Sequence, residues 1–103
     1  MSTNDQPQIY YVLFHTPGPK WVEGTDFREQ PGVIDHVQYM ASFMEGERLV
    51  IGGPFLDNSG GMMVMRADSQ AEAETVANAD PSVQAGLLKV HVRPWFVPMA
   101  TVK

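Results

Sequence analysis

The sequence predicts an α+β domain of the ferredoxin-like kind, in which four antiparallel strands form one sheet and two helices cover one face. Three observations support this prediction. The expected elements follow the order strand, helix, strand, strand, helix, strand. A polar turn at residues 57–60 joins the second strand to the third as a hairpin. The length of 103 residues suits a single domain spanning residues 1–103.

The first strand is expected at residues 9–15, where the segment IYYVLFH is rich in aromatic and β-branched side chains. Residues 1–8 are polar and are expected to form a flexible N-terminal tail. Residues 16–30 contain several prolines and glycines and are expected to form a long loop. Long loops in small domains are often functional, and a tolerated surface insertion is the alternative.

The first helix is expected at residues 31–46, with Pro31 in its first turn and Gly46 at its C-terminal end. Its apolar residues recur with helical spacing at Val33, Val37, Met40 and Met44. His36 lies at the edge of this apolar stripe.

The second half of the chain is expected to contain a hairpin, a helix and a last strand. The hairpin strands are predicted at residues 48–56 and 61–67. The second helix is predicted at residues 69–79, where Ser69 and Glu72 have the spacing of a capping box. The last strand is predicted at residues 88–98.

The first and third strands are apolar on both faces, although two helices can cover only one face of the sheet. An exposed apolar patch of several hundred Å² favours association. The sequence therefore predicts a homodimer packed through the sheet faces, with Met63 and Met65 or their alternates buried. The alternative is that the N-terminal tail or the loop at residues 16–30 folds over that face.

Composition excludes several classes of function. The net charge of −5 and the absence of a basic run argue against nucleic acid and anionic membranes as partners. No apolar stretch approaches the ~20 residues that cross a bilayer. The chain has no cysteine, which excludes disulfides, thiol nucleophiles and thiolate metal sites. A cytoplasmic location is expected, because residues 1–8 also lack an apolar signal segment.

His36 and Asp80 are the candidate catalytic residues. Imidazole titrates near neutral pH and a carboxylate can orient it, so a pair of this kind could transfer protons. Each residue also has a structural interpretation: His36 could be a partly buried helix histidine, and Asp80 before Pro81 could cap a short helix. His15 and His91 have no close-spaced partner, so no metal site is expected.

Three features resemble the YCII-related family over residues 9–98: a helix histidine followed by a tyrosine, a Gly-Pro pair in the next strand, and an Asp-Pro pair after the second helix. In this chain they are His36 and Tyr39, Gly53 and Pro54, and Asp80 and Pro81. The resemblance implies a dimeric α+β barrel with an active site at the histidine and the aspartate. It also implies substrate-binding roles for Tyr39, Gly53 and Pro54, to which Ser82 is added for its closeness to Asp80; the alternative for Ser82 is a capping role.

The expected function is that of a small enzyme without a cofactor or a metal ion. His36 would transfer a proton on a small ring or lactone substrate, by elimination, dehalogenation or isomerisation, with Asp80 fixing the tautomer. The resemblance implies this chemistry, because known relatives include enzymes that dechlorinate aromatic compounds. The alternative is a non-catalytic small-molecule binding or accessory domain that uses the same pocket.

Overall fold

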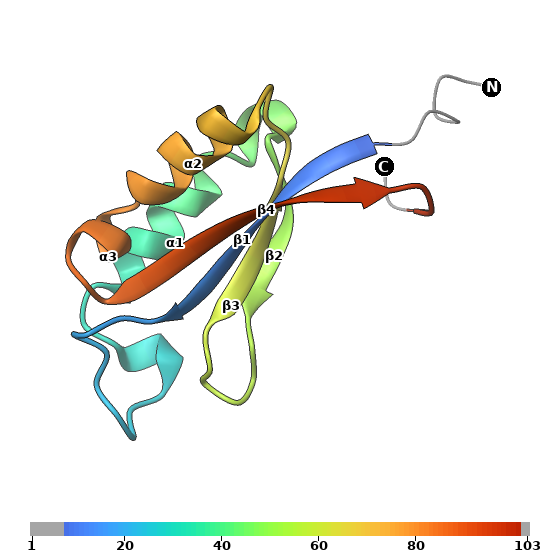
Figure 1. Ribbon diagram of the computed structural model, residues 1–103. Coiled ribbons are helices and arrows are strands. Elements are labelled where there is room, and N and C mark those ends of the chain that lie inside the picture. The colour runs from blue at the N-terminus through green and yellow to red at the C-terminus, as the bar shows by residue number, and fades with distance from the viewer. Residues whose placement is uncertain (1–7, 102–103) are drawn as a thin grey trace.

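The computed structural model describes residues 8–101, and it confirms the predicted α+β fold with one antiparallel sheet and its helices on one face (Figure 1). The strand order is β2-β3-β1-β4. The strands are β1 Gln8–Pro17, β2 Leu49–Pro54, β3 Gly61–Met65 and β4 Leu88–Val97. The helices are α1 Val33–Ala41, α2 Gln70–Asn78 and α3 Pro81–Gln84, with short 3₁₀ turns η2 Phe27–Glu29 and η3 Glu45–Glu47.

The strand β1 is central and pairs with both β3 and β4. Its register with β3 places His15 opposite Gly61, and its register with β4 places His15 opposite Val90. Successive strand side chains point to opposite faces. His15 therefore shares the helix-covered face with Leu13, near the end of the strand.

The hydrophobic core lies between this face of the sheet and the helices. Its fully buried members include Leu13 and Met65 from the sheet, Met40 from α1, and Ala73 and Ala77 from α2. The two alanines place only methyl groups between α2 and the strands, so the helix can pack closely against the sheet.

The first helix differs from its predicted form. It ends at Ala41 rather than near residue 46, and Gly46 and Glu47 both adopt positive φ in the turn that follows. Met40 is buried as predicted, but Val37 is 56% exposed and Met44 is 63% exposed. His36 instead lies on the buried side. The predicted apolar stripe fails because the outer part of this short helix borders a cavity and solvent rather than the core.

The second helix begins as predicted. The hydroxyl of Ser69 accepts a hydrogen bond from the backbone N–H of Glu72. The Glu72 carboxylate accepts one from the N–H of Asp68, one residue earlier than in a standard capping box. After α2, Asp80 caps the separate short helix α3 with Pro81 at its first position, as the structural interpretation of Asp80 predicted.

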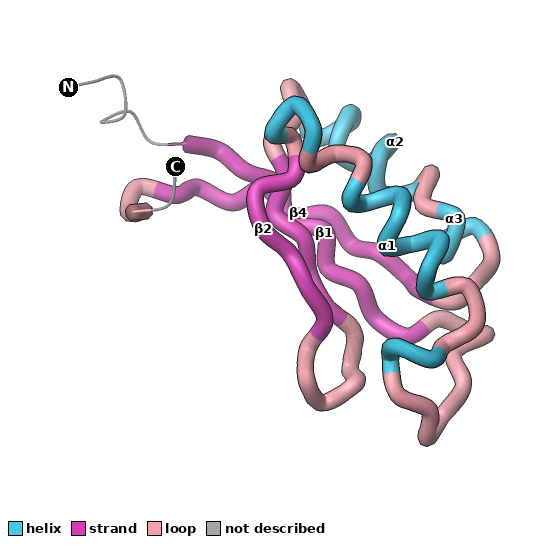
Figure 2. Tube along the Cα trace, turned by 180° about the vertical axis from the view of Figure 1, so that it is seen from behind, coloured by secondary structure: helices cyan, strands magenta, loops and turns pink. Residues whose placement is uncertain are grey.

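The predicted loop at residues 16–30 is shorter and more ordered than expected. Strand β1 continues through Pro17, and the rest of the segment contains η2. The Phe27 N–H donates to the side-chain oxygen of Asn58 at 2.9 Å, which ties the segment to the β2–β3 turn. Figure 2 shows the two loops side by side at one end of the sheet. The predicted tail falls outside the described residues except for Gln8, which begins β1.

The face of the sheet opposite the helices carries apolar side chains without a helix to cover them. By alternation from the core residues, it includes Tyr10, Val12 and Val64, with Trp95 opposite Tyr10 in the register. Trp95 is 45% exposed. Met63 and Met65 point toward the core. Met62 and Val64, which alternate with them along β3, therefore point toward the outer face. The predicted dimer remains a prediction.

Within residues 8–101, every helix is too short or too polar to cross a lipid bilayer.

Candidate functional site

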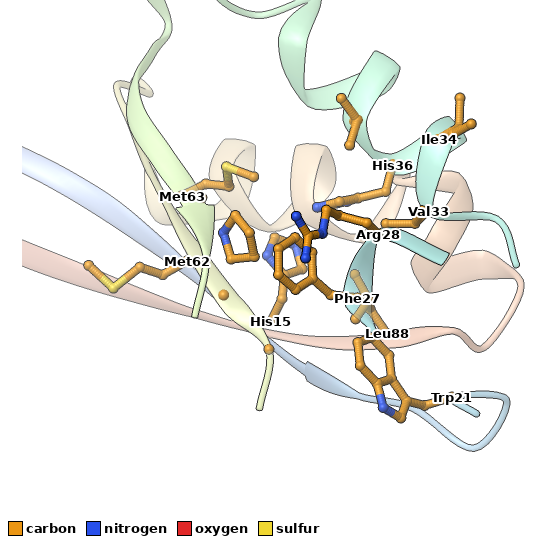
Figure 3. A pocket seen from close by; sticks show the side chains of 15 residues that line it. His15, Trp21, Phe27, Arg28, Val33, Ile34, His36, Met62, Met63 and Leu88 are labelled. Carbon is orange, nitrogen blue, oxygen red and sulfur yellow. The ribbon is translucent and has the colours of Figure 1, made fainter. Parts of the chain in front are cut away.

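A cavity of about 320 Å³ opens where the first turn of α1, the η2 segment and the β2–β3 hairpin meet the sheet (Figure 3). Its walls are mostly apolar, and its polar side chains are His15, His36 and Arg28. The other lining residues are Trp21, Phe27, Val33, Ile34, Val37, Gly53, Pro54, Gly60, Gly61, Met62, Met63 and Leu88. Apolar walls with a few converging polar groups are typical of small-molecule sites.

His36 and Asp80 meet at this cavity, as predicted. The His36 Nδ1 lies 2.6 Å from Asp80 Oδ2, and both side chains are buried. The other carboxylate oxygen, Oδ1, accepts hydrogen bonds from the backbone N–H and the hydroxyl of Ser82, at 2.9 and 2.8 Å. Asp80 therefore caps α3 with one oxygen and binds His36 with the other. The two interpretations of Asp80 hold together, and the catalytic role of the pair remains a prediction.

The carboxylate of Asp80 is held in its charged form. Burial raises the pKa of Asp80, but the hydrogen bond and charge of His36, together with the Ser82 hydrogen bonds, lower it further than burial raises it. An ionised carboxylate accepts hydrogen bonds only, so the Nδ1 of His36 carries the proton between them. When the His36 ring is neutral, its Nε2 then has the free lone pair.

His15 completes the polar part of the site, and sequence reasoning missed it. Its ring is 2% exposed and lies edge-on to the His36 ring, with 4.9 Å between centroids. Its Nε2 is 3.9 Å from Asp80 Oδ2, and neither ring nitrogen has a hydrogen-bond partner among the described residues. Burial, then the charge of His36, lower the pKa of His15 to about 4, against an opposing effect of Asp80.

His15 has no close-spaced partner in the sequence, but the fold places its ring beside His36 and Asp80. Sequence spacing does not show the contact, because 21 positions separate His15 from His36 and more separate it from Asp80. The available signal was strand alternation, which places His15 on the same face as Leu13. His15, His36 and Asp80 each offer one metal-ligating atom, and these atoms lie within 4.8 Å of one another.

The structure places the predicted substrate-binding residues in two groups. Gly53 and Pro54 line the cavity, whereas Tyr39 and Ser82 do not. The Tyr39 hydroxyl donates to the Val76 carbonyl at 2.7 Å and so joins α1 to α2. Burial, and then the charge of Asp80, raise the pKa of Tyr39. The structure thus favours supporting roles for Tyr39 and Ser82, and it gives no support for their predicted contact with substrate.

The segment at residues 16–30 supplies one wall of the cavity through Trp21, Phe27 and Arg28. Sequence reasoning left open whether this segment was functional. The signal that could have favoured a binding role is the presence of two large aromatic residues in an otherwise polar loop. Arg28 is paired with Asp26, whose Oδ1 lies 2.9 Å from the Arg28 Nε.

A family model described as the YCII-related domain matches residues 9–96. The chain belongs to the YCII-related family. This confirms the resemblance drawn from His36, Gly53-Pro54 and Asp80-Pro81. Among curated proteins, the uncharacterized protein YjpA of Bacillus subtilis is 34% identical over 71 residues, which cover 69% of this chain and 84% of YjpA.

Among solved structures, this YCII-related chain is similar to 5-chloro-2-hydroxyhydroquinone dehydrochlorinase (TftG) from Burkholderia phenoliruptrix AC1100, in complex with 2,5-dihydroxybenzoquinone. The two share 20% sequence identity and a TM-score of 0.64. The match covers 84% of this chain and 92% of the other. At this level of identity the likeness shows the shared fold.

Proposed function

We propose that this protein is a small enzyme in which His36 acts as a general base on a small ring substrate and Asp80 holds the histidine in the required tautomer. The observation that carries this proposal is the 2.6 Å contact between His36 Nδ1 and Asp80 Oδ2 at the wall of an apolar cavity. A base, an orienting carboxylate and an apolar cavity beside them are parts that proton-transfer catalysis uses.

The chemistry follows from the tautomer. Nδ1–H donates to Asp80, so Nε2 accepts a proton from a C–H or O–H group of the substrate. The negative charge of Asp80 stabilises the imidazolium that forms. If the electron pair of the broken C–H bond forms a double bond while a leaving group departs with its own pair, the reaction is an elimination. If the proton returns at another atom, it is an isomerisation.

The cavity indicates the size and type of substrate. Its volume of about 320 Å³ is roughly twice that of a ~150 Å³ engineered apolar cavity that binds benzene. The space therefore suits one ring with a few substituents. Trp21 and Phe27 offer aromatic faces on the wall. The structural relative TftG is a dehydrochlorinase, and the loss of hydrogen chloride is an elimination, which adds support to this reaction class for the shared fold.

The alternative is a binding domain that holds a small ring compound without converting it. His15 favours this candidate, because a buried ring without a partner beside the cavity could serve to hold a ligand rather than to react. The two functions predict different effects of replacing His36. In an enzyme, turnover falls while ligand affinity is retained; in a binding domain there is no turnover to lose.

The test is a screen of metal-free protein against hydroxylated chlorinated rings and small lactones, with chloride release and proton–deuterium exchange as readouts. For a converted compound, we expect His36→Asn to lower kcat by about 10²–10⁴-fold while ligand binding is retained. Asp80→Asn should also lower kcat, because the amide no longer enforces the same tautomer. His91→Asn changes an exposed histidine on β4 and serves as the matched control.

Two results would contradict the enzyme proposal. One is a kcat in His36→Asn that equals that of the wild type. The other is a ring compound that binds tightly at His36 and undergoes neither conversion nor exchange, which would favour the binding domain.

We also propose that the protein acts as a homodimer joined through the sheet faces. The support is the apolar face opposite the helices, with Tyr10 and the half-exposed Trp95 side by side in the β1–β4 register.

A further inference from the structure

The ring of His15 is buried and has no hydrogen-bond partner in the described part of the chain. An imidazole that is 2% exposed should find a hydrogen-bond partner, because a buried polar group without one costs about 1–3 kcal/mol. Both ring nitrogens of His15 lack a partner among residues 8–101. The proposed proton transfer between His36 and its substrate does not use this ring. His15 therefore calls for an explanation of its own.

The backbone fixes His15 in this position. It pairs with Gly61 on one side and with Val90 on the other, inside the central strand. Gly60 packs so closely that an added Cβ would overlap the carbonyl oxygen of His15. The ring thus stands on a rigid element, which is the setting that a precise ligand site needs.

The structure places a carboxylate oxygen of Asp80 close to the His15 ring. The Nε2–Oδ2 separation of 3.9 Å is too long for a hydrogen bond, and the same oxygen is 2.6 Å from His36 Nδ1. The three ligand atoms lie within 4.8 Å of one another. Metal–nitrogen and metal–oxygen bonds of about 2.0–2.2 Å place two ligands of one ion roughly 3–4 Å apart. To surround one ion, the His36–Asp80 pair would open by about 0.5 Å, and a pair at the 4.8 Å limit would close by about 1 Å.

We propose that His15, His36 and Asp80 form a binding site for a divalent transition-metal ion such as Zn²⁺ or Co²⁺. Two imidazoles and one carboxylate on one side of an ion, with open positions opposite, are a recurrent donor set for these metals. Mg²⁺ and Ca²⁺ prefer oxygen ligands and fit this set poorly. The adjoining cavity provides the open positions.

Ser82 would fix the orientation of the Asp80 carboxylate in such a site. Its N–H and hydroxyl hold Oδ1 of Asp80 at 2.9 and 2.8 Å, which leaves Oδ2 directed toward the histidines. Hydrogen bonds of this kind fix the orientation of a ligating carboxylate. The buried position of Ser82, which sequence reasoning assigned to substrate binding, is consistent with this role.

Metal binding has a chemical consequence for His36. An ion that binds Nδ1 needs the lone pair of that nitrogen, so the single proton of the neutral ring leaves Nδ1 and Nε2 takes one up from solvent, with no net release of a proton. The proton of the ring then sits on Nε2, so the ion-bound ring has no free lone pair with which to act as the base. Beyond the proposed function, the site would therefore regulate it: the ion-bound form would be inactive in the reaction proposed for the metal-free form.

The test is a titration of protein treated with EDTA and then dialysed, first with Co²⁺ and then with Zn²⁺ at pH 8. We expect one equivalent of Co²⁺ to bind with a visible absorption band, and Zn²⁺ to displace it. His15→Leu should weaken binding at least about 100-fold, since even the loss of an outer-shell partner costs 10–100-fold. His91→Leu should bind like the wild type, and Mg²⁺ should not displace Co²⁺.

A second readout does not depend on any variant. On Zn²⁺ addition, the ring ¹⁵N resonances of His15 and His36 should shift together at one equivalent, while those of His91 stay in place. If His15→Leu does not fold, His15→Gln and the NMR titration of the wild type give the same decision. The proposal is overturned if neither ion binds more tightly than about 1 mM, if binding persists in the His15 variant, or if the shifting resonance is that of His91. Activity measured in EDTA tests the proposed function separately.

Discussion

Gln30 is expected to hold the wall of the cavity in place, and its replacement by alanine tests this directly. Its side chain is 2% exposed. The amide nitrogen donates to the carbonyls of Val22 and Thr25 at 2.8 and 2.9 Å, and the amide oxygen accepts from the Val22 N–H at 2.9 Å. These three bonds cross-link the segment that carries Trp21 and Phe27.

The size of the effect follows from those bonds. At a net value of about 1 kcal/mol each, their loss destabilises the closed segment by about 3 kcal/mol. The core of the domain does not depend on them, so we expect most of this loss to appear as local opening. Urea unfolding should show a smaller global decrease, of about 1–2 kcal/mol, and ligands of the cavity should bind more weakly.

The assay is hydrogen–deuterium exchange read at single amides. The Val22 N–H loses its acceptor in Gln30→Ala and should exchange far faster, whereas the core amide of Leu13 should keep its protection. Gln38→Ala changes an exposed glutamine of α1 and is the control. Unchanged protection at Val22, together with stability within about 0.5 kcal/mol of the wild type, would refute the assignment of this role to Gln30.

Three further predictions concern His15, the outer face of the sheet and Gly60. In metal-free protein, His15 has a pKa of about 4 when folded and 6.5 when unfolded, so its contribution to stability is present above pH 6.5 and is lost as the pH falls toward 4. The loss reaches about 3 kcal/mol. If the free energy of unfolding in urea depends on pH in the same way in His15→Leu and in the wild type, this prediction is contradicted. Trp95→Glu should convert a dimer into a monomer in sedimentation experiments, and a wild type that is monomeric at micromolar concentration would refute the dimer. Gly60→Ala should destabilise the fold by more than Gly24→Ala in thermal unfolding, because both glycines have positive φ but only Gly60 packs against the carbonyl of His15; equal effects would show that backbone conformation alone matters.

The sequence by itself determined the arrangement of the elements and the family. Strand and helix periodicity, the capping residue Ser69 and the turn at residues 57–60 are local signals, because they reflect the conformational preferences of neighbouring residues. The His36–Asp80 contact also came from the sequence, through the resemblance to the YCII-related family. Chemical reasoning alone left it open, since 44 positions separate the two residues.

Only the tertiary structure decided which side chains share the cavity. His15 joins His36 and Asp80 because antiparallel pairing brings the end of β1 under α1 and the start of α3, and no local pattern encodes that approach. Tyr39 fits the family motif, yet its hydroxyl reaches Val76 on the neighbouring helix instead of the cavity. The same reason explains the failed apolar stripe at Val37: helical spacing shows which residues share a face, while the packing of the whole chain decides whether that face meets the core or an open cavity.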